Sequence, residues 1–451
     1  MTERYGDTPA GHRTGEPVTT KLHRIGRKAR REPGFRFTSL FHLMDMELLR
    51  GCFGRLRKDA AAGIDGVTKA EYAVGLERRL ADLVDRLHRM AYVPQPVKRH
   101  YIPKPGSDKR RPLGIPVLED KLVQAGLVRI LEQVYEQDFI GDSYGFRPGR
   151  NCHDALRGLS RTVEKGNIHW IVDADIKGFF DNVDHGWMMK FLRQRIGDTR
   201  VLRMVQRFLK AGVIEEERWQ DSNRGTPQGG VISPLLANIY LHYALDLWFE
   251  RVFRRACRGK ARLIRYADDF VVCFQREADA RRFRSHLEGR LGRFGLEIHP
   301  AKTKVIAFGP AAASRARREG RRHPETFDFL GFTHYCSRTW NGRRFRMKRV
   351  TSRKHFRAKH AAFTDWLKAA RATLTNRELW QKACEKLRGH YAYYGVTDNS
   401  PGIHRFAFQA RRLLFQWLNR QGGKRRMNWE AFARMEARFP LPRPRIRVNL
   451  F

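Results

Sequence analysis

Two adjacent carboxylates, Asp268 and Asp269, lie between strand-like runs at residues 262–265 and 270–274. The intervening residues are few enough for a tight turn, which would hold both carboxylates at the tip of a β-hairpin and out of the core. Paired carboxylates on a rigid hairpin can bind two Mg²⁺ ions for nucleotidyl transfer. Taken alone, an Asp-Asp pair is also ordinary turn chemistry. The hairpin is therefore a candidate metal site that needs support from a further carboxylate.

A third carboxylate, Asp175, comes at the end of another strand-like run. A two-metal site needs at least one carboxylate from a separate strand beside the Asp268–Asp269 hairpin, and we assign Asp175 to that role. Two other nearby acids have structural interpretations. Asp173 is interpreted as a strand-end acid and Asp181 as a helix N-cap.

The segments around these acids alternate between strand and helix patterns. Apolar spacing predicts one helix over residues 185–211 and another after Ser233-Pro234, with Ser233 as its N-cap. Between them, a loop with two adjacent glycines, Gly229 and Gly230, would let a template and a nucleotide approach the main chain closely. Strands and helices of this kind would frame the acids in a mixed α+β domain.

The chain is strongly basic, with 89 Lys and Arg residues against 47 Asp and Glu and a formal charge of +42. Such an excess indicates a polyanionic partner, most simply nucleic acid. A basic secreted or membrane-surface protein is the alternative. The sequence opposes it, because it shows no signal peptide and no apolar run near the ~18 residues of a membrane span.

Six cysteines are scattered along the chain, without Cys-x₂-Cys spacing and without a Cys/His cluster. This pattern argues against a zinc site and against a disulfide framework. It fits a protein of a reducing cytoplasm. The length of 451 residues allows roughly two to four domains.

A series of motifs resembles those of reverse transcriptases, and specifically of the proteins encoded within bacterial group II introns. Each block alone is a modest signal, but the ordered set is specific and covers roughly residues 40 to 335. The blocks include Gly63-Ile64-Asp65-Gly66, Arg110-Arg111-Pro112-Leu113-Gly114, Tyr144-Gly145-Phe146-Arg147-Pro148-Gly149, the Asp175 block, Gly225-Thr226-Pro227-Gln228-Gly229-Gly230, Tyr266-Ala267-Asp268-Asp269 and Phe327-Asp328-Phe329-Leu330-Gly331.

The resemblance implies an α+β right-hand polymerase, with fingers, a palm built on an antiparallel sheet, and an α-helical thumb or maturase domain. The expected division is a basic flexible tail over 1–34, fingers over 35–165, palm over 166–335, thumb over 336–420 and a short basic DNA-binding tail over 421–451. Many relatives carry a C-terminal HNH-type endonuclease. The sequence runs only to Phe451, so we expect the subgroup that lacks it.

The resemblance also implies roles at the polymerase site. Asp175, Asp268 and Asp269 would hold two Mg²⁺ ions, joined by the Ile176 carbonyl. An aromatic residue at Phe180, with Phe179 as the competing candidate, would pack under the ribose and exclude a 2′-hydroxyl. The other expected nucleotide contacts are Lys104, Arg111, Gln228, Gly229 and Lys302.

Beyond the polymerase motifs, residues 311–360 carry 15 Lys and Arg against three acids. Aromatic residues such as Trp340 are interleaved with the charges, which favours a surface that stacks bases and contacts phosphates over a merely solvated face. The predicted nucleic-acid-binding residues are Arg343, Arg344, Arg346, Lys348, Arg349, Lys424, Arg425 and Arg426.

The function implied by the resemblance is RNA-directed DNA polymerisation, together with binding of the parent intron RNA to assist splicing and mobility. The implied partners are the group II intron RNA, an RNA template with a DNA primer, dNTPs and target DNA, in the bacterial cytoplasm and without a membrane or zinc. Open alternatives are a splicing-only maturase, a domesticated enzyme of defence or repair, and a viral RNA-dependent RNA polymerase. The intact acids oppose the first alternative, and Phe180 opposes the last.

Overall fold

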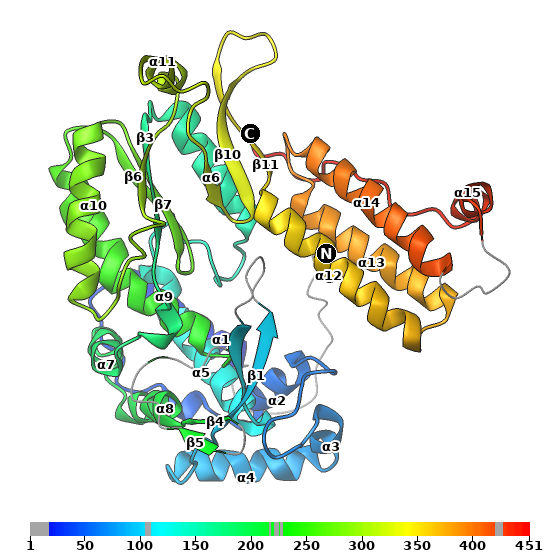
Figure 1. The fold of residues 1–451 in the computed structure, drawn as a ribbon. Coiled ribbons are helices and arrows are strands. Elements are labelled where there is room, and N and C mark those ends of the chain that lie inside the picture. Colours follow the sequence, from blue (N-terminus) through cyan, green and yellow to red (C-terminus); the bar gives the residue numbers. More distant parts are fainter. Residues whose placement is uncertain (1–17, 104–109, 216–217, 221–224, 226–228, 420–426) are drawn as a thin grey trace.

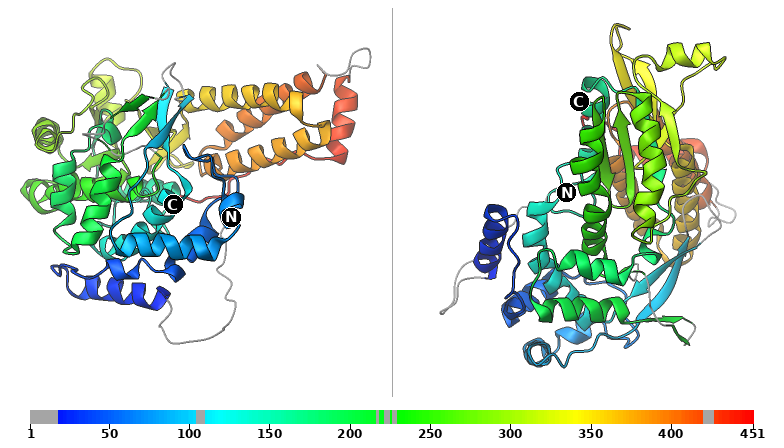
Figure 2. Two further views of the ribbon diagram at one scale, coloured as in Figure 1. Left: turned by 90° about the horizontal axis from the view of Figure 1, so that it is seen from below. Right: turned by 90° about the vertical axis from the view of Figure 1, so that its left-hand side faces the viewer.

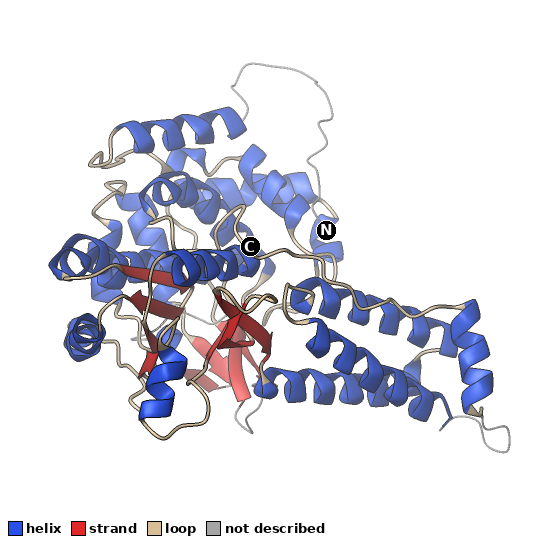
Figure 3. Ribbon diagram, turned by 90° about the horizontal axis from the view of Figure 1, so that it is seen from above, coloured by secondary structure: helices blue, strands red, loops and turns tan. Residues whose placement is uncertain are grey.

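The computed structural model describes residues 18–103, 110–215, 218–220, 225, 229–419 and 427–451. Figure 1 shows a helix-rich lower body, an upper body that contains the central sheet, and a helical arm on one side. Seen from above in Figure 3, the strands gather near the middle of the molecule and helices surround them. The predicted α+β class, followed by a helical C-terminal region, is therefore confirmed.

The lower body is organised around α5 (Leu118–Asp138), which is buried on several sides. The N-terminal helix α1 (Val18–Arg31) packs along α5 and buries Leu22 and Ala29. The expectation of a flexible tail over residues 1–34 is therefore wrong for α1, where apolar residues recur at helical spacing. Residues 1–17 lie outside the described residues.

Short helices and a small sheet complete the lower body. The sheet has the order β2-β1-β4-β5, with β1 and β2 antiparallel. The elements are η1 (Phe41–Leu43), α2 (Met46–Arg55), α3 (Lys69–Ala73), α4 (Leu76–His88), β1 (Val97–Pro103), β2 (Arg110–Ile115), β4 (Val213–Glu215) and β5 (Arg218–Gln220).

The central sheet has the strand order β6-β7-β3-β8, and all neighbouring strands are antiparallel. Side chains alternate between the two faces of a strand. Val172 and Phe270 face the core that contains α10 (Glu277–Gly292), whereas Ile171 and Val271 face the core that contains α6 (Cys152–Lys165). The strands are β3 (Trp170–Asp175), β6 (Ala261–Tyr266), β7 (Asp269–Phe274) and β8 (Lys304–Ala307).

The helices between β3 and β6 differ from the prediction at their ends. Residues 185–211 form two helices, α7 (His185–Leu192) and α8 (Thr199–Lys210), rather than one. The break occurs because Asp198 caps α8 and also accepts hydrogen bonds from the backbone N–H groups of Leu40 and Phe41. The N-cap of α7 is Asp184, so the assignment of Asp181 as an N-cap is wrong. Asp181 ends the 3₁₀ turn η2 (Phe179–Asp181).

The helix that begins at Ser233 runs through several irregular turns. Ser233 is its first residue rather than its N-cap, because Ile232 occupies the cap position. The α-helical part then passes into π-helical turns, which widen the helix and often accompany functional sites. The segments are α9 (Ser233–Leu241), η3 (His242–Asp246), η4 (Phe249–Phe253) and η5 (Arg254–Ala256).

The helical arm follows a second antiparallel sheet of order β11-β10-β9. Its helices share one core with α6 and one face of the central sheet. Figure 2 (left) shows the arm standing away from the lower body. The elements are α11 (Ala312–Arg318), β9 (Phe327–Phe329), β10 (Phe332–Arg338), β11 (Phe345–Thr351), α12 (Arg353–Thr373), α13 (Asn376–Tyr394), α14 (Ser400–Asn419) and α15 (Trp429–Arg438).

The described part of residues 421–451 packs against this arm. Phe432 of α15 is fully buried, Val448 pairs with Val396, and Leu450 is fully buried. Binding of DNA by this stretch stays a prediction. Among the helices that the structure describes, none is both long and apolar enough to span a membrane.

Candidate active site

The β6–β7 hairpin forms as the sequence predicted. Tyr266 pairs with Asp269, and Ala267 and Asp268 make the turn between them. Ala267 has a left-handed φ of 58°, a conformation that residues with a Cβ seldom adopt. The turn therefore places Asp268 at the tip of the hairpin and Asp269 at the start of β7.

Strand pairing brings the third acid to the same place. Asp175 at the end of β3 is directly opposite Asp269 of β7. Because side chains of one parity share a face of a strand, Asp173 lies on the same face as these two acids. Asp173 was interpreted from the sequence as a structural acid. The register makes it a neighbour of the site that sequence reasoning left out.

The carboxyls at this edge influence one another. Desolvation by the surrounding protein, together with the negative charges of Asp173 and Asp268, raises the pKa of Asp269 to about 8. The Asp269 side chain is nevertheless exposed at the sheet edge, so the like charges are the firmer cause of the direction. Burial likewise raises the pKa of Asp173 to about 7, with Asp175 contributing. The carboxyls gathered at this edge therefore raise one another's pKa, a repulsion that a bound cation would relieve.

One lysine does reach the acids. The Lys302 Nζ lies 2.5 Å from Asp175 Oδ2, and both side chains are about half-exposed. Lys302 was expected near a triphosphate. The structure places it at the carboxylate edge, where a bound nucleotide or cation would compete with it for Asp175.

The carbonyl of Ile176 remains outside the adjacent backbone pairing. The bridge between Ile176 and Ile298 is made by two flanking hydrogen bonds, from the Lys177 N–H to the Glu297 carbonyl and from the His299 N–H to the Asp175 carbonyl, both 2.8 Å. The Ile176 carbonyl takes part in neither bond. This arrangement is compatible with its predicted role beside the carboxylates.

The donor set at this edge suits hard divalent cations, which prefer carboxylate and carbonyl oxygens. Within the described part of the chain, no three His, Cys, Asp or Glu side chains converge closely enough to enclose a metal ion. The types of donor and their placement on two neighbouring strands suit divalent cations, but in this structure the carboxyls do not converge on one point and Asp175 is paired with Lys302.

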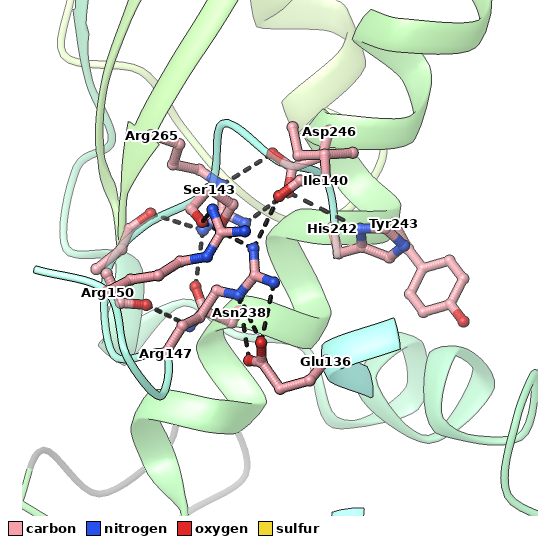
Figure 4. Close-up of polar contacts among 12 residues, drawn as sticks. Glu136, Ile140, Ser143, Arg147, Arg150, Asn238, His242, Tyr243, Asp246 and Arg265 are labelled. Atoms are coloured by element: carbon pink, nitrogen blue, oxygen red, sulfur yellow. Dashed lines mark hydrogen bonds and ion pairs between the residues drawn. The ribbon is translucent and has the colours of Figure 1, made fainter. Parts of the chain in front are cut away.

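A buried arginine stabilises the β6–β7 turn by a hydrogen bond to its backbone. Arg265 of β6 is fully buried, and its Nη1 donates to the Ala267 carbonyl at 2.9 Å. Its guanidinium also makes a two-point ion pair with Asp246, at 2.8 and 2.5 Å, and donates to Asn238 Oδ1 at 2.9 Å. Figure 4 shows these side chains gathered behind the hairpin, with Asp246 and Asn238 contributed by the irregular helix.

The same network reaches the Tyr144–Gly149 motif. Asn238 Nδ2 donates to the Gly145 carbonyl at 2.7 Å, and the Tyr144 N–H donates to the Arg265 carbonyl at 2.8 Å. A Cβ on Gly145 would lie 2.3 Å from the Ala267 backbone nitrogen. Glycine is therefore required where this loop packs against the β6–β7 turn. Sequence reasoning missed Arg265, Asp246 and Asn238, although charged residues within apolar runs were a signal for buried partners.

The candidate for ribose selection is resolved between two neighbouring aromatics. Phe179 is buried in the main core, whereas Phe180 is only half-buried and packs edge-on against it at 5.3 Å. Only Phe180 therefore has surface available to a nucleotide. A Cβ on Gly225 would lie 2.9 Å from the Phe180 carbonyl oxygen, so the glycine-rich loop begins directly against this turn.

The other predicted nucleotide contacts are described incompletely. Gly229 has a φ of 114°, and a Cβ there would lie 2.4 Å from the Gly114 carbonyl of β2. Gly229 is thus required for the contact between its loop and β2. Arg111 belongs to β2 by its backbone, paired with Ile102, but its side chain is not described. Lys104 and Gln228 lie outside the described residues.

The predicted nucleic-acid-binding residues near β11 differ in their exposure, because alternate residues of a strand face opposite sides. Arg343 and Arg344 are exposed, and Arg346 and Lys348 are half-buried on the outer face of β11. Arg349 faces inward instead, is fully buried, and donates to Ser160 Oγ at 2.7 Å. The prediction that Arg349 contacts nucleic acid is therefore wrong. Lys424, Arg425 and Arg426 lie outside the described residues.

An antiparallel sheet that presents acids from two neighbouring strands, set between a helix-rich body and a helical arm, defines a polymerase of the right-hand class. Comparison with known proteins agrees, since residues 102–334 match the model of the family "Reverse transcriptase (RNA-dependent DNA polymerase)". The chain belongs to the reverse transcriptase family.

Individual relatives place the chain near proteins of group II introns. It is 39% identical over 228 residues to the group II intron-encoded protein LtrA of Lactococcus lactis, which is 50% of this chain and 38% of that protein. It is 35% identical over 275 residues to protein YkfC of Escherichia coli, covering 54% of this chain and 71% of YkfC. It is 44% identical over 157 residues to an uncharacterised 91 kDa protein in the cob intron of Schizosaccharomyces pombe, covering 35% of this chain and 19% of that protein. The matches thus span well under half of two of these relatives.

Proposed function

We propose that the protein is an RNA-directed DNA polymerase encoded by a group II intron. The observation that carries the proposal is the direct pairing of Asp175 with Asp269 across β3 and β7, with Asp268 at the adjoining turn. A splicing cofactor without polymerase activity would have no need to align several acids at one sheet edge. Membership of the reverse transcriptase family supports the same conclusion.

In this proposal, Asp175, Asp268 and Asp269 hold two Mg²⁺ ions with the Ile176 carbonyl. When bound, such ions activate the primer 3′-hydroxyl and stabilise negative charge on the pyrophosphate leaving group. Lys302 lies within reach of the same oxygens. A cation on Asp175 would compete with Lys302, whose ammonium group would then be available to contact the triphosphate and to donate a proton to pyrophosphate.

The remaining parts of the molecule would serve substrate binding. Phe180 would pack under the ribose and exclude ribonucleotides, and Lys104, Arg111, Gln228 and Gly229 would contact the nucleotide and the templating pair. We assign the fingers to 35–165, the palm to 166–335 and the thumb to 336–420. The high positive charge would bind the parent intron RNA, the template–primer duplex and the target DNA in the bacterial cytoplasm.

Primer extension tests this proposal. Wild-type protein, given an RNA template, a DNA primer, dNTPs and Mg²⁺, is expected to extend the primer. The Asp268→Ala/Asp269→Ala variant is expected to lose at least about 10²-fold in rate, because it lacks the charges that hold the ions. Asp82→Ala, which removes an exposed acid of α4, is the control for loss of negative charge alone.

RNA binding is measured on the same preparations. Retained binding by the double variant, with extension lost, supports a metal-dependent reverse transcriptase. Absence of extension by the wild type, with tight binding to structured RNA, would overturn the polymerase proposal and favour a splicing-only maturase.

A further inference from the structure

The β10–β11 hairpin has one face in the core and one face outside it. Strand pairing places Cys336 opposite Met347 on the inner face. On the outer face, Ser337 is opposite Arg346 and Tyr335 is opposite Lys348. In Figure 1 the hairpin extends beyond the upper body, and its loop lies at the edge of the molecule. The loop is therefore accessible to a large partner, whereas Arg346 on the outer face is partly covered by Phe451.

The loop carries a fully exposed tryptophan. Trp340 has a relative exposure of 102%, the highest among the large apolar side chains of the described residues. Trp is normally buried for much of its surface because its transfer from water is strongly favourable. An indole in this position exposes both faces of its ring, so a flat ring of a partner molecule can stack on it.

The backbone around Trp340 is an ordered turn. The Gly342 N–H donates to the Thr339 carbonyl at 2.9 Å, which places Trp340 as the second residue of a β-turn, and Gly342 has a φ of 68°. The Thr339 N–H donates to the Arg344 carbonyl at 2.9 Å, and the Thr339 hydroxyl donates to Asn341 Oδ1 at 2.7 Å. The turn therefore fixes the backbone that carries the indole, so little backbone entropy is lost when the indole is contacted.

The exposed charge on the loop itself is positive. Arg343 and Arg344 are exposed next to the turn, whereas Arg346 packs on the Phe451 ring and both Arg346 and Lys348 lie near Asp398. The sequence contains no Asp or Glu between Asp328 and Asp365. A partner that places flat rings against Trp340 and negative charge against these cations is a nucleic acid.

We propose that the tip of the β10–β11 hairpin binds a single-stranded segment of RNA, with one base stacked on Trp340 and its flanking phosphates on Arg343 and Arg344. Bases in a duplex are stacked on their neighbours, whereas bases in loops, bulges and single strands are free to stack on an aromatic side chain. This inference deepens the proposed function, because it names the form of RNA that one surface recognises. It does not depend on polymerase activity.

The experiment measures binding of the full chain to a fluorescently labelled single-stranded RNA and to a fully paired RNA–DNA hybrid of equal length. Trp340→Ala is expected to weaken binding of the single strand by about 5- to 150-fold, the range for removal of one stacking aromatic. Trp340→Phe, which keeps a ring, is expected to restore most of the affinity. Binding of the hybrid is expected to stay unchanged, because its bases are paired.

Phe408 provides a matched control. It is an exposed aromatic of α14, with 57% exposure, so Phe408→Ala removes a surface ring at another place. A 2-aminopurine base in the single strand should be quenched by the wild type and less by Trp340→Ala. Equal affinities of wild type and Trp340→Ala for the single strand would overturn the inference. Loss of hybrid binding as well would also overturn it, since the tip would then not distinguish single strands.

Failure of this inference is distinguishable from failure of the proposed function. If wild-type protein extends primers and Trp340→Ala binds single strands normally, only the inference falls. If wild-type protein does not extend primers but Trp340→Ala loses single-strand affinity, the inference stands without the polymerase. Unchanged RNA affinity with reduced self-association of Trp340→Ala would assign the tip to a second copy of the chain, against the proposal.

Discussion

The acids proposed for catalysis depend on a residue that would touch none of the reactants. Arg265 holds the carbonyl of Ala267 and is itself held by Asp246, so the turn with a strained φ rests on a buried ion pair. Removal of one partner of a buried ion pair lowers the free energy of unfolding by roughly 3–5 kcal/mol. The position of the acids and the stability of the palm are therefore linked through one guanidinium group.

Replacement of Arg265 by lysine should separate these two effects. Arg265→Lys keeps the charge near Asp246 but loses the planar fork that also reaches Ala267. We expect kcat, measured per folded molecule, to fall at least about tenfold, because displaced carboxylates impair the chemical step. The KM for dNTP should change little, because binding of the nucleotide is less sensitive to their exact position. Arg349→Lys is the matched control, since Arg349 is also fully buried but donates to Ser160 of α6. Equal loss in both variants would indicate a general effect of buried arginines.

Selection of the sugar should depend on Phe180. Its half-buried ring belongs to η2, the turn that follows β3, whereas the ring of Phe179 is part of the core. Phe180→Ala is expected to reduce the preference for dNTPs over rNTPs by at least about tenfold, because the steric block to a 2′-hydroxyl is removed. Incorporation of the two nucleotide types opposite the same template base measures the ratio. An unchanged ratio with normal extension would contradict the assignment.

At the scale of elements, contiguous patterns were predictable and contacts between distant segments were not. The β6–β7 hairpin follows from two short runs and a turn that lie next to one another in the sequence. The burial of Arg349 follows from strand parity, which a count of basic residues ignores. Helix α1 was missed because its charge obscured the apolar spacing of Leu22 and Ala29. The pairing of Arg265 with Asp246 joins a strand to an irregular helix, and local patterns do not specify such a pair.

The start of α5 contains an acid that should make stability depend on pH. Asp120 is buried and accepts hydrogen bonds from the Tyr92 hydroxyl at 2.7 Å and from the Gln95 N–H at 3.1 Å. Burial raises its pKa to about 7. The folded state therefore retains the proton over a range where the unfolded state has lost it. The stability that Asp120 contributes is present in acid and is lost as pH rises through about 7.

Asp120→Asn should remove this pH dependence, because the amide stays neutral and can still bond Tyr92 and Gln95. Between about pH 5 and 8, the free energy of unfolding of the wild type is expected to fall relative to the variant by on the order of 3 kcal/mol. Urea denaturation at several pH values measures the difference. Asp82→Asn, at an exposed position of α4, serves as the control. A difference that does not change with pH would contradict a raised pKa.

At the scale of the whole molecule, a formal charge of +42 makes RNA affinity sensitive to salt. Each phosphate contact on a single strand contributes about 0.7 to the slope of log affinity against log salt concentration. Arg343→Ala/Arg344→Ala should therefore reduce that slope by about 1.4. Filter binding of a single-stranded RNA at several salt concentrations measures it. Arg349→Lys should leave the slope unchanged, and an unchanged slope in the double variant would show that these arginines do not meet phosphates.

The apolar core beneath α12, α13 and α14 continues without a break into the face of the central sheet that carries the acids. A hinge between arm and sheet would have to separate apolar side chains and expose them to water, at a cost of roughly 25 cal/mol for each Å² uncovered. The arm should therefore keep a fixed position relative to the central sheet and should not open and close over it. In the proposed polymerase, an arm fixed in this way would not open to release the template, so we expect long uninterrupted copying once synthesis has begun.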